Sequence, residues 1–377
     1  MRFDTVIIGG GLAGLTAGIS LQEAGRKTAI VSSGQNAMHF FSGNFESVGP
    51  DRERIAALFA AAGVRTNALD GQMLMPMGTF RDVSLTLEDV TVFPDRHIAD
   101  KALVVNFTGF HDFFSTFLAD ALEQGGTACR IRFVRLPEME HLRVSPSEMR
   151  SVNIARAMDE HWEKVVADIR ILHKDEDLII LPQVFGLKDA SVLDKIRTAL
   201  PARVAFVGTM PPSVPGIRTQ MLLKRRFEVL GGTYLMGDEV NSAALHEGVV
   251  SSVTTRNLDT VRLFADHFIL ATGGCFSKGL VTTPTQVYEP LFGLDLDFPE
   301  NRSAWYRADF FADQPYMGFG VKTDGTLHAM KDGEPVRNLF AIGSILGNGR
   351  KEDFGTAAGL AIRTAFAVVD NIKGESV

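Results

Sequence analysis

The feature that most constrains this chain is a glycine-rich hexapeptide, Gly9-Gly10-Gly11-Leu12-Ala13-Gly14, which fits the pattern GxGxxG. The apolar run Thr5 to Ile8 before it predicts a buried parallel strand, and Leu15 to Ala24 after it predicts a helix. In such a unit Gly11 lets the backbone approach a pyrophosphate, and Gly14 lets the helix lie against the strand. The amino terminus of the helix stabilises the phosphate charge. The hexapeptide therefore predicts a dinucleotide-binding fold of the Rossmann type.

Two segments in the second half of the chain favour a flavin over a nicotinamide cofactor. A strand predicted at Phe268 to Ala271 ends in Ala271-Thr272-Gly273-Gly274, which resembles the ATGG turn of flavoproteins related to fumarate reductase. Gly318 to Asp324, followed by Asn338 to Gly343, resembles the carboxyl-terminal flavin segment of the same proteins. In that segment a strand ends at a glycine, and a helix amino terminus points toward the flavin ring, where negative charge develops on reduction. The three motifs stand in the order that a flavin-binding fold requires.

The length of the chain, 377 residues, predicts two interleaved domains, because single cores usually stop growing at about 250–300 residues. We expect an α/β protein: a Rossmann-type FAD/NAD(P)-binding fold with a small β-meander and an inserted α/β cap domain. The meander is predicted from short strands around Tyr234, at 249–254 and at 261–264. The predicted flavin-binding domain comprises 1–75, 213–275 and 317–377, and the predicted cap or substrate domain comprises 76–212 and 276–316.

Three further stretches carry a closer resemblance: Gly34 to Gly43, Ala102 to Phe113, and Pro211 to Arg218. Together they make the chain similar, over essentially its whole length, to the B-subunit family of anaerobic glycerol-3-phosphate dehydrogenase. The resemblance implies a flavoprotein, usually described with FMN, that oxidises sn-glycerol 3-phosphate to dihydroxyacetone phosphate. It also implies two partners: a larger, flavin-binding A subunit, and an iron-sulfur C subunit that passes electrons toward membrane quinone.

Two departures from the usual FAD pattern favour FMN, with FAD as the alternative. The second strand, Thr28 to Val31, is followed by Ser32-Ser33, where an acidic residue usually binds the adenosine ribose. Ser344 stands where many such proteins carry an aspartate. The Ser32 position is also compatible with NADP, its 2′-phosphate held by Arg26 or Lys27, but nothing downstream resembles a nicotinamide site. We expect the following residues to contact the cofactor: Gly9, Gly11, Leu12, Ala13, Gly14, Ser32, Ser33, Gly34, Ser42, Gly43, Ala271, Thr272, Gly273, Gly343, Ser344, Gly355 and Thr356.

Oxidation of a secondary alcohol by a flavin needs a base for the hydroxyl proton, and a phosphorylated substrate needs a cation. His39, in the loop after the second strand, is the predicted base; a surface or packing histidine is the alternative. Arg218, at the start of a predicted helix, is the predicted anion contact; an ordinary salt bridge is the alternative. Arg350 and Lys351 precede the last helix and are candidates for the flavin phosphate, the substrate or a partner, with a solvated charge pair as the alternative.

Composition narrows the remaining choices. The formal net charge is −7, which leaves no basic field for nucleic acid. Cys129 and Cys275 are the only cysteines, so we expect no metal site and no iron-sulfur cluster in this chain. No signal peptide and no apolar run of about 18 residues is apparent. These observations predict a cytoplasmic protein, and the resemblance implies that it is peripheral to the inner membrane through its partner subunits.

Two other functions stay open at this stage. One is a non-catalytic flavin subunit that relays electrons or serves assembly, which the weak ribose anchor and the lack of an obvious acid and base pair would suit. The other is a stand-alone flavoenzyme of the fumarate-reductase or aspartate-oxidase type.

Overall fold

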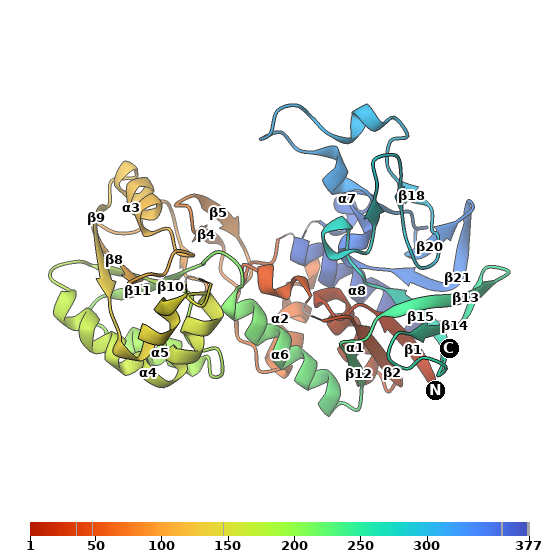
Figure 1. The fold of residues 1–377 in the computed structure, drawn as a ribbon, viewed down its shortest axis with the longest axis horizontal. Coiled ribbons are helices and arrows are strands. Elements are labelled where there is room, and N and C mark those ends of the chain that lie inside the picture. The colour runs from red at the N-terminus through yellow and green to blue at the C-terminus, as the bar shows by residue number, and fades with distance from the viewer. Residues whose placement is uncertain (35, 47, 146, 356, 375–377) are drawn as a thin grey trace. The chain divides into compact units, whose positions relative to one another are not determined.

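The computed structural model describes residues 1–34, 36–46, 48–145, 147–355 and 357–374. By their contacts they form two compact units, drawn in Figure 1. The first unit comprises Met1–Ala37, Glu46–Gly63 and Gln220–Val377, and the second comprises Met38–Phe45 and Val64–Thr219. Residues 276–316, which the sequence analysis assigned to the cap, have their contacts within the first unit. The functional roles of the predicted domains stay predictions.

The first unit is built on a sheet in the order β12-β2-β1-β15-β14-β13, with β21 beside β15 and β20 beside β21. The pairings between β12, β2, β1, β15 and β21 are parallel, whereas β13, β14 and β20 pair antiparallel. These strands span Arg2–Ile8 (β1), Thr28–Ser32 (β2), Thr233–Met236 (β12), Val240–His246 (β13), Val249–Thr255 (β14), Leu263–Leu270 (β15), His328–Lys331 (β20) and Glu334–Ala341 (β21).

Helices α1 (Leu12–Glu23) and α8 (Ala357–Gly374) pack against each other in the first unit. Every residue of α1 from Ala13 to Leu21 is buried. A helix that is apolar all round belongs in the interior of a protein, which is where the sequence places this one. Two further helices, α2 (Arg52–Ala61) and the short α7 (Lys351–Phe354), also belong to the first unit.

The second unit contains a four-stranded parallel sheet in the order β11-β10-β8-β9. Helix α3 lies on one face of this sheet, and α4 and α5 lie on the other (Figure 1). The elements span Lys101–Phe107 (β8), Ser115–Gln124 (α3), Ala128–Val134 (β9), Ser151–Leu172 (α4), Leu178–Pro182 (β10), Ser191–Ala199 (α5) and Arg203–Val207 (β11). Because consecutive strands are added on opposite sides of β8, the order reverses between β8 and β10.

Short antiparallel strands precede this sheet in the second unit and pair as β5-β4-β7 and β3-β6. They span Thr66–Asn67 (β3), Gly71–Leu74 (β4), Phe80–Val83 (β5), Thr86–Leu87 (β6) and Val92–Phe93 (β7). Helix α6 (Val214–Val229) follows β11, with its first residues in the second unit and the rest in the first. No helix in the described ranges combines the length and the apolar character needed to cross a bilayer.

The predicted fold class is confirmed, with three local corrections. Helix α1 begins at Leu12 rather than Leu15, so the glycine motif supplies the first helical turn. The strand around Tyr234 is not part of the meander, because β12 pairs parallel with β2 in the main sheet. The strands predicted at 261–264 and 268–271 are one strand, β15, whose first half pairs with β14 and whose second half pairs with β21.

Candidate functional site

The carboxyl ends of the parallel strands in the first unit lie in register. Ile8 of β1 pairs with Val31 of β2 and with Leu270 of β15, and Leu270 pairs with Ala341 of β21. Three backbone hydrogen bonds continue these ladders: from the amide of Gly9 to the Val31 carbonyl (2.9 Å), from Ala271 to Ile8 (2.8 Å), and from Ile342 to Leu270 (3.0 Å). The loops that follow β1, β2, β15 and β21 therefore leave one edge of the sheet together, which is where parallel sheets bind ligands.

Backbone packing requires glycine at one position of the loop after β1 and at one position in the first turn of α1. Gly9 has φ +119°, and a Cβ there would lie 2.2 Å from the carbonyl oxygen of Ala271. A Cβ on Gly14 would lie 1.9 Å from the carbonyl oxygen of Gly9. A side chain at either position would push α1 or the loop away from the strand ends. The close approach of loop and helix that the sequence predicts is thus present.

The amino terminus of α1 is bare backbone. Its N-cap is Gly11, no described side chain caps it, and the first turn carries no acidic residue. The nearest described atom to a Cβ built on Gly11 is the Cβ of Asn36, at 3.9 Å. Helix amino termini leave unpaired N–H groups that favour a phosphate. Leu12 and Ala13, the first helical residues, stand where those N–H groups lie.

The segments after β15 and β21 meet at the same edge. Gly273 has φ +79°, and a Cβ there would lie 3.3 Å from Oγ of Ser344, an exposed residue. Gly343 has φ +74°, and its Cβ would lie 3.0 Å from the Cβ of Ala13 in α1. Thr272 has a buried hydroxyl oxygen without a hydrogen-bond partner among the described atoms. The two positive-φ glycines keep the segments after β15 and β21 close to each other and to α1, and this close backbone packing fits a bound flavin.

The loop after β2 differs from the usual ribose site. Ser32 is 4% exposed, and its hydroxyl lies 3.4 Å from the carbonyl of Gly34. The phenol of Tyr234 in β12 hydrogen-bonds to Ser32, and burial raises the pKa of this phenol. The Tyr234 oxygen would lie 2.1 Å from a Cβ on Gly10. Ser33 is exposed, and Gly34 has φ +149° with open space around it among the described atoms.

Three residues that the sequence analysis did not select support this edge. Asn36 donates from Nδ2 to the Gly10 carbonyl (2.7 Å), and Tyr234 lies over the same glycine. Thr364 of α8 accepts the Gly343 amide at its hydroxyl (2.9 Å). Asn36 lies in the loop that the sequence predicts after the second strand, so its place near the site could have been predicted. Tyr234 and Thr364 depend on tertiary pairing, which their local sequence does not reveal.

Other predicted contacts lie elsewhere in the chain. His39, Ser42 and Gly43 belong to the second unit, where the Gly43 carbonyl accepts the amide of Leu87 (2.7 Å). The His39 ring packs on Phe40, with 4.1 Å between ring centroids. Gly355 ends α7 with φ +81°, and Thr356 lies outside the described residues. The cofactor and catalytic roles of these residues stay predictions.

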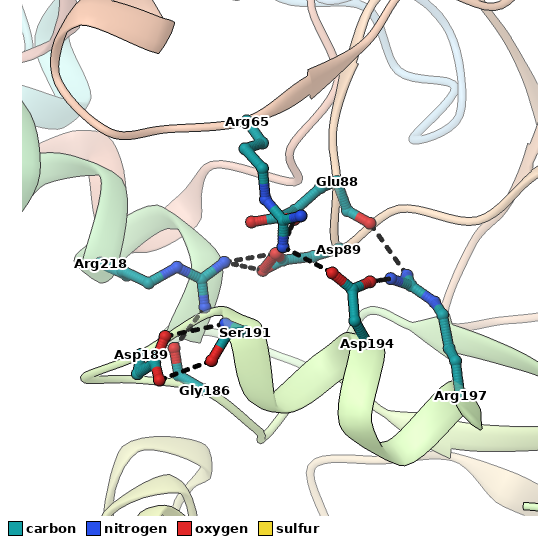
Figure 2. A network of polar contacts seen from close by, with 9 residues as sticks. All are labelled: Arg65, Glu88, Asp89, Gly186, Asp189, Ser191, Asp194, Arg197 and Arg218. Carbon is teal, nitrogen blue, oxygen red and sulfur yellow. Dashed lines mark hydrogen bonds and ion pairs between the residues drawn. The ribbon is translucent and has the colours of Figure 1, made fainter. Parts of the chain in front are cut away.

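Arg218 takes part in a buried ion pair in the second unit, as Figure 2 shows. Its guanidinium donates to both carboxylate oxygens of Asp89 and to the Gly186 carbonyl (2.6 Å). The side chains of Arg218 and Asp89 are 7% and 3% exposed. Gly186 follows β10, and Gln183 in the same loop donates to the Asp89 backbone carbonyl (3.2 Å). The salt bridge considered as the alternative for Arg218 is therefore the interaction present.

Further charges surround this pair (Figure 2). Arg65 pairs with both Glu88 and Asp194, and Arg197 donates to Asp194 (3.0 Å) and to the Glu88 carbonyl (3.0 Å). Burial, opposed by Arg65 and reinforced by Asp89, raises the pKa of Glu88 above its usual value.

Near the carboxyl terminus, Arg350 donates to the Asp324 carbonyl, to Thr323 (3.2 Å) and to Asp353 (3.0 Å). Its guanidinium links the segment after Gly318 to helix α7, whereas Lys351 is exposed. Across the described ranges, no group of three or more His, Cys, Asp or Glu residues is arranged to hold a metal ion.

Comparison with known proteins gives one family match and many full-length relatives. The model of a family described as FAD binding domain matches residues 4–60 and 55–352. A protein of Pectobacterium atrosepticum, named as the B subunit of anaerobic glycerol-3-phosphate dehydrogenase, is 37% identical over 418 residues, covering 100% of this chain and 99% of its own. Proteins of the same name from Yersinia pestis and Glaesserella parasuis are 34% and 32% identical, with at least 99% of each chain covered.

Among solved structures, similarity is distant. A 3-ketosteroid dehydrogenase from Rhodococcus jostii aligns over 98% of this chain and 96% of its own, with 13% identity and a TM-score of 0.40. L-proline dehydrogenase from P. horikoshii aligns over 100% and 94%, with 11% identity and a TM-score of 0.39.

Proposed function

Because the chain belongs to the FAD-binding domain family and to the B-subunit family of anaerobic glycerol-3-phosphate dehydrogenase, we propose that it is a flavin-binding subunit of a dehydrogenase complex. In this proposal the complex oxidises sn-glycerol 3-phosphate to dihydroxyacetone phosphate and delivers the electrons toward quinone. The substrate comes from the names of the relatives, since fold alone does not determine it.

One observation carries the flavin part of the proposal: the uncapped amino terminus of α1 at the edge where four strand ends meet. Gly9 and Gly14 bring the backbone close, and Gly11 leaves room for phosphate oxygens. Thr272 and the exposed Ser344 follow β15 and β21, the strands whose following segments the sequence predicts to contact the flavin ring. When bound, the flavin supplies the acceptor for the two electrons removed from the alcohol.

We infer FAD as the flavin, in place of the FMN predicted from the sequence. The match to the FAD-binding family over residues 4–352 supports the larger cofactor. The missing carboxylate after β2 argued for FMN, but the Tyr234 hydroxyl at Ser32 and Gly10 offers a polar group in that region. Ribose binding by Tyr234 needs one hydrogen bond in place of the usual carboxylate pair, so we expect the cofactor to be held less tightly.

The partners and location extend the same proposal. The word subunit in the relatives' names supports a complex of several chains. We propose that the partners are a large flavin subunit, which is the A member of the complex, and an iron-sulfur subunit, which is the C member. Attachment to the inner membrane through these two partners completes the proposal.

The experiment that tests the proposal starts with the purified chain. Its visible spectrum reveals a flavin, and acid release followed by chromatography separates FAD from FMN. Anaerobic addition of sn-glycerol 3-phosphate to the chain alone, and then to the chain mixed with both partner subunits, tests bleaching of the flavin. A colourless protein that takes up neither flavin in excess contradicts the flavin assignment, and a flavin that is never bleached contradicts the substrate.

The structure also favours keeping the relay function as a second candidate. Arg218, the predicted cation for the substrate phosphate, donates to Asp89 and Gly186 inside the second unit. A relay subunit that transfers electrons without binding glycerol 3-phosphate needs no such cation. Bleaching of the isolated chain by the substrate contradicts the relay function, whereas bleaching that depends on the large flavin subunit supports it.

A further inference from the structure

Helix α8 carries a polar side chain on its buried face. Thr364 is 0% exposed. The other buried residues of α8 are glycine or apolar: Ala358, Gly359, Leu360, Ile362, Ala365, Phe366, Val368, Val369 and Ile372. A buried hydroxyl is unfavourable unless it is hydrogen-bonded. The hydrogen bonds of Thr364 therefore indicate what this side chain does.

The Thr364 hydroxyl makes one bond inside its own helix and one outside it. It donates to the carbonyl of Leu360 (2.6 Å), and it accepts the N–H of Gly343 (2.9 Å). The first bond is the usual one of a serine or threonine inside a helix, to the carbonyl four residues earlier. The second bond reaches the turn that follows β21. A valine of the same shape packs as well at this position but cannot accept that N–H.

Gly343 is the residue at which the chain turns after β21. It is buried and has φ +74°. The amide before it, that of Ile342, donates to the Leu270 carbonyl (3.0 Å) at the end of β15. Two consecutive amides are thus held by two different elements, β15 and α8. Because a buried N–H without an acceptor is unfavourable, the Thr364 hydroxyl fixes the place where the chain leaves the sheet.

This turn lies between two segments of the proposed flavin site. A Cβ on Gly343 would lie 3.0 Å from the Cβ of Ala13 in the first turn of α1. The next residue, Ser344, is exposed, and its Oγ would lie 3.3 Å from a Cβ on Gly273. A shift of Gly343 therefore moves Ser344 relative to both segments. Binding sites depend on geometry held to within about 0.5 Å, so the bond from Gly343 to Thr364 has consequences for the ligand.

The lost bond affects the free protein and the flavin complex differently. Without the Thr364 acceptor, the turn of the free protein can move until the Gly343 N–H reaches water. A flavin bound against the same turn opposes that movement, so the N–H stays buried without a partner. The loss then lowers the affinity for the cofactor, in addition to any effect on the stability of the free protein.

We propose that Thr364 is a positioning residue for the flavin: its hydroxyl accepts the Gly343 N–H and so holds the turn after β21 in the conformation that binds the cofactor. This inference rests on the proposed function, which makes the chain a flavoprotein. Thr364 acts through Gly343 and Ser344, and its own side chain stays inside the protein, between α8 and the turn.

The test compares three variants of the full chain. Thr364→Val removes the acceptor and keeps the shape, and Thr364→Ser keeps the hydroxyl. Thr16→Val is the matched control, because Thr16 in α1 is also 0% exposed, but its hydroxyl has no hydrogen-bond partner among the described atoms. Three quantities are measured for each: the dissociation constant for FAD added to the apoprotein, the visible circular dichroism of the bound FAD, and the hydrogen-exchange rate of the Gly343 amide.

Thr364→Val is expected to weaken FAD binding about tenfold, because one buried donor loses its acceptor. The circular dichroism of the bound FAD changes, since the turn beside it has moved, and the Gly343 amide exchanges faster than in the wild type. Thr364→Ser and Thr16→Val are expected to bind FAD within about threefold of the wild type, with the Gly343 amide still protected.

Wild-type affinity in Thr364→Val overturns the inference, as does an equal loss in Thr16→Val. Weaker binding with an unchanged flavin spectrum and unchanged Gly343 exchange also overturns it, because the loss is then one of general stability. If Thr364→Val does not fold, the wild type decides: a Gly343 amide that exchanges as fast as that of the exposed Gly325 overturns the inference. A wild-type chain that binds no flavin overturns the proposed function itself, whereas unaffected binding by Thr364→Val leaves that function standing.

Discussion

The two units use the carboxyl edge of a parallel sheet in opposite ways. In the first unit the strand β1 ends in glycines, and the helix that follows has no side-chain cap among the described residues. In the second unit the loop after β10 is filled by side chains: Gln183 bonds to Asp89, and Arg218 joins Asp89 to Gly186. One edge leaves backbone donors available, and the other satisfies its polar groups within the chain.

This difference teaches how similar α/β layouts acquire different functions. Parallel sheets with helices on their faces offer a site at the strand ends whether or not a ligand uses it. Glycine keeps such a site open, whereas a buried ion pair closes it and needs a precise partner for each charge. We call the carboxyl edge of the sheet in the first unit the open edge, and that of the parallel sheet in the second unit the closed edge. Mutations at the open edge are expected to affect flavin binding more than stability, and mutations at the closed edge are expected to affect mainly stability.

The largest expected effect is loss of flavin at the open edge. Gly11→Glu places a carboxylate at the amino terminus of α1, where it competes with the cofactor phosphate for the N–H groups. We expect bound flavin to fall at least about tenfold, while the free energy of unfolding of the apoprotein changes by less than about 1 kcal/mol. The ratio of flavin absorbance to protein absorbance measures the first, and urea unfolding measures the second. Gly325→Glu is the control, because Gly325 has open space among the described atoms; equal flavin in both variants contradicts the site.

At the closed edge, Asp89→Asn is expected to cost about 3–5 kcal/mol of the free energy of unfolding, because Arg218 stays buried without a countercharge. Hydrogen exchange should place the loss in β8, β10 and β11. Asp370→Asn breaks an exposed pair with Arg54 and should cost about 1 kcal/mol or less. Replacing both partners, as Asp89→Leu with Arg218→Met, should recover most of the loss. Equal effects for Asp89→Asn and Asp370→Asn would refute a closed, ion-paired edge.

A smaller effect distinguishes two glycines of the open edge. A methyl group on Gly14 would overlap the Gly9 carbonyl, whereas one on Gly11 would not touch a described atom closer than 3.9 Å. Gly14→Ala should therefore destabilise the apoprotein by about 1–3 kcal/mol, the usual cost of overpacking. Gly11→Ala should leave thermal unfolding almost unchanged. If the two variants melt alike, the close packing of α1 on the loop is wrong.

The smallest effect is a difference in pH dependence within the second unit. The pKa of Glu88 is raised, chiefly by burial, so the folded state holds this proton more tightly than the unfolded state. Its stabilising contribution is present below about pH 4.5 and is lost as the pH rises through the folded-state pKa. As the pH rises from 4.5 to neutrality, the free energy of unfolding of Glu88→Gln should therefore fall less than that of the wild type.

Glu138 provides the control with the opposite sign. A hydrogen bond from Lys164 is the main cause that lowers the pKa of Glu138, so its contribution is present above about pH 4.5 and is lost as the pH falls through the lowered pKa. When the pH is lowered from neutral to acid values, the free energy of unfolding of Glu138→Gln should therefore fall less than that of the wild type. Urea unfolding at several pH values measures the free energy of unfolding of both variants. If this free energy changes with pH in the same way in both, the opposite pKa shifts of Glu88 and Glu138 are contradicted.

The sequence was most informative where local rules decide the structure. The glycine spacing around Gly9, Gly11 and Gly14 predicted the strand, turn and helix, because the steric demands of a close approach are local. The ATGG turn and the glycine after β21 predicted loops that do meet this edge.

Contacts between residues far apart in the chain could not be predicted from the sequence. Arg218 has the same local sequence whether it meets a substrate phosphate or Asp89, and only the fold reveals the carboxylate. Tyr234 reaches Ser32 because β12 pairs with β2, a pairing between segments far apart in the chain. The exposed rings of Phe310 and Phe311 could not be told from core phenylalanines, because composition does not report accessibility.

The pairing of β1 with β15 also has a consequence for the order of events during synthesis. Gly9 leaves the ribosome early, but Ala271, whose carbonyl lies against it, and the β21 strand at Glu334–Ala341 follow only after the second unit has been made. Contacts between such distant segments form slowly, because a long loop must close first. The segment Val64–Thr219 is complete earlier and forms a sheet of its own. The nascent chain therefore cannot complete this edge of the sheet until almost all of its residues have been translated.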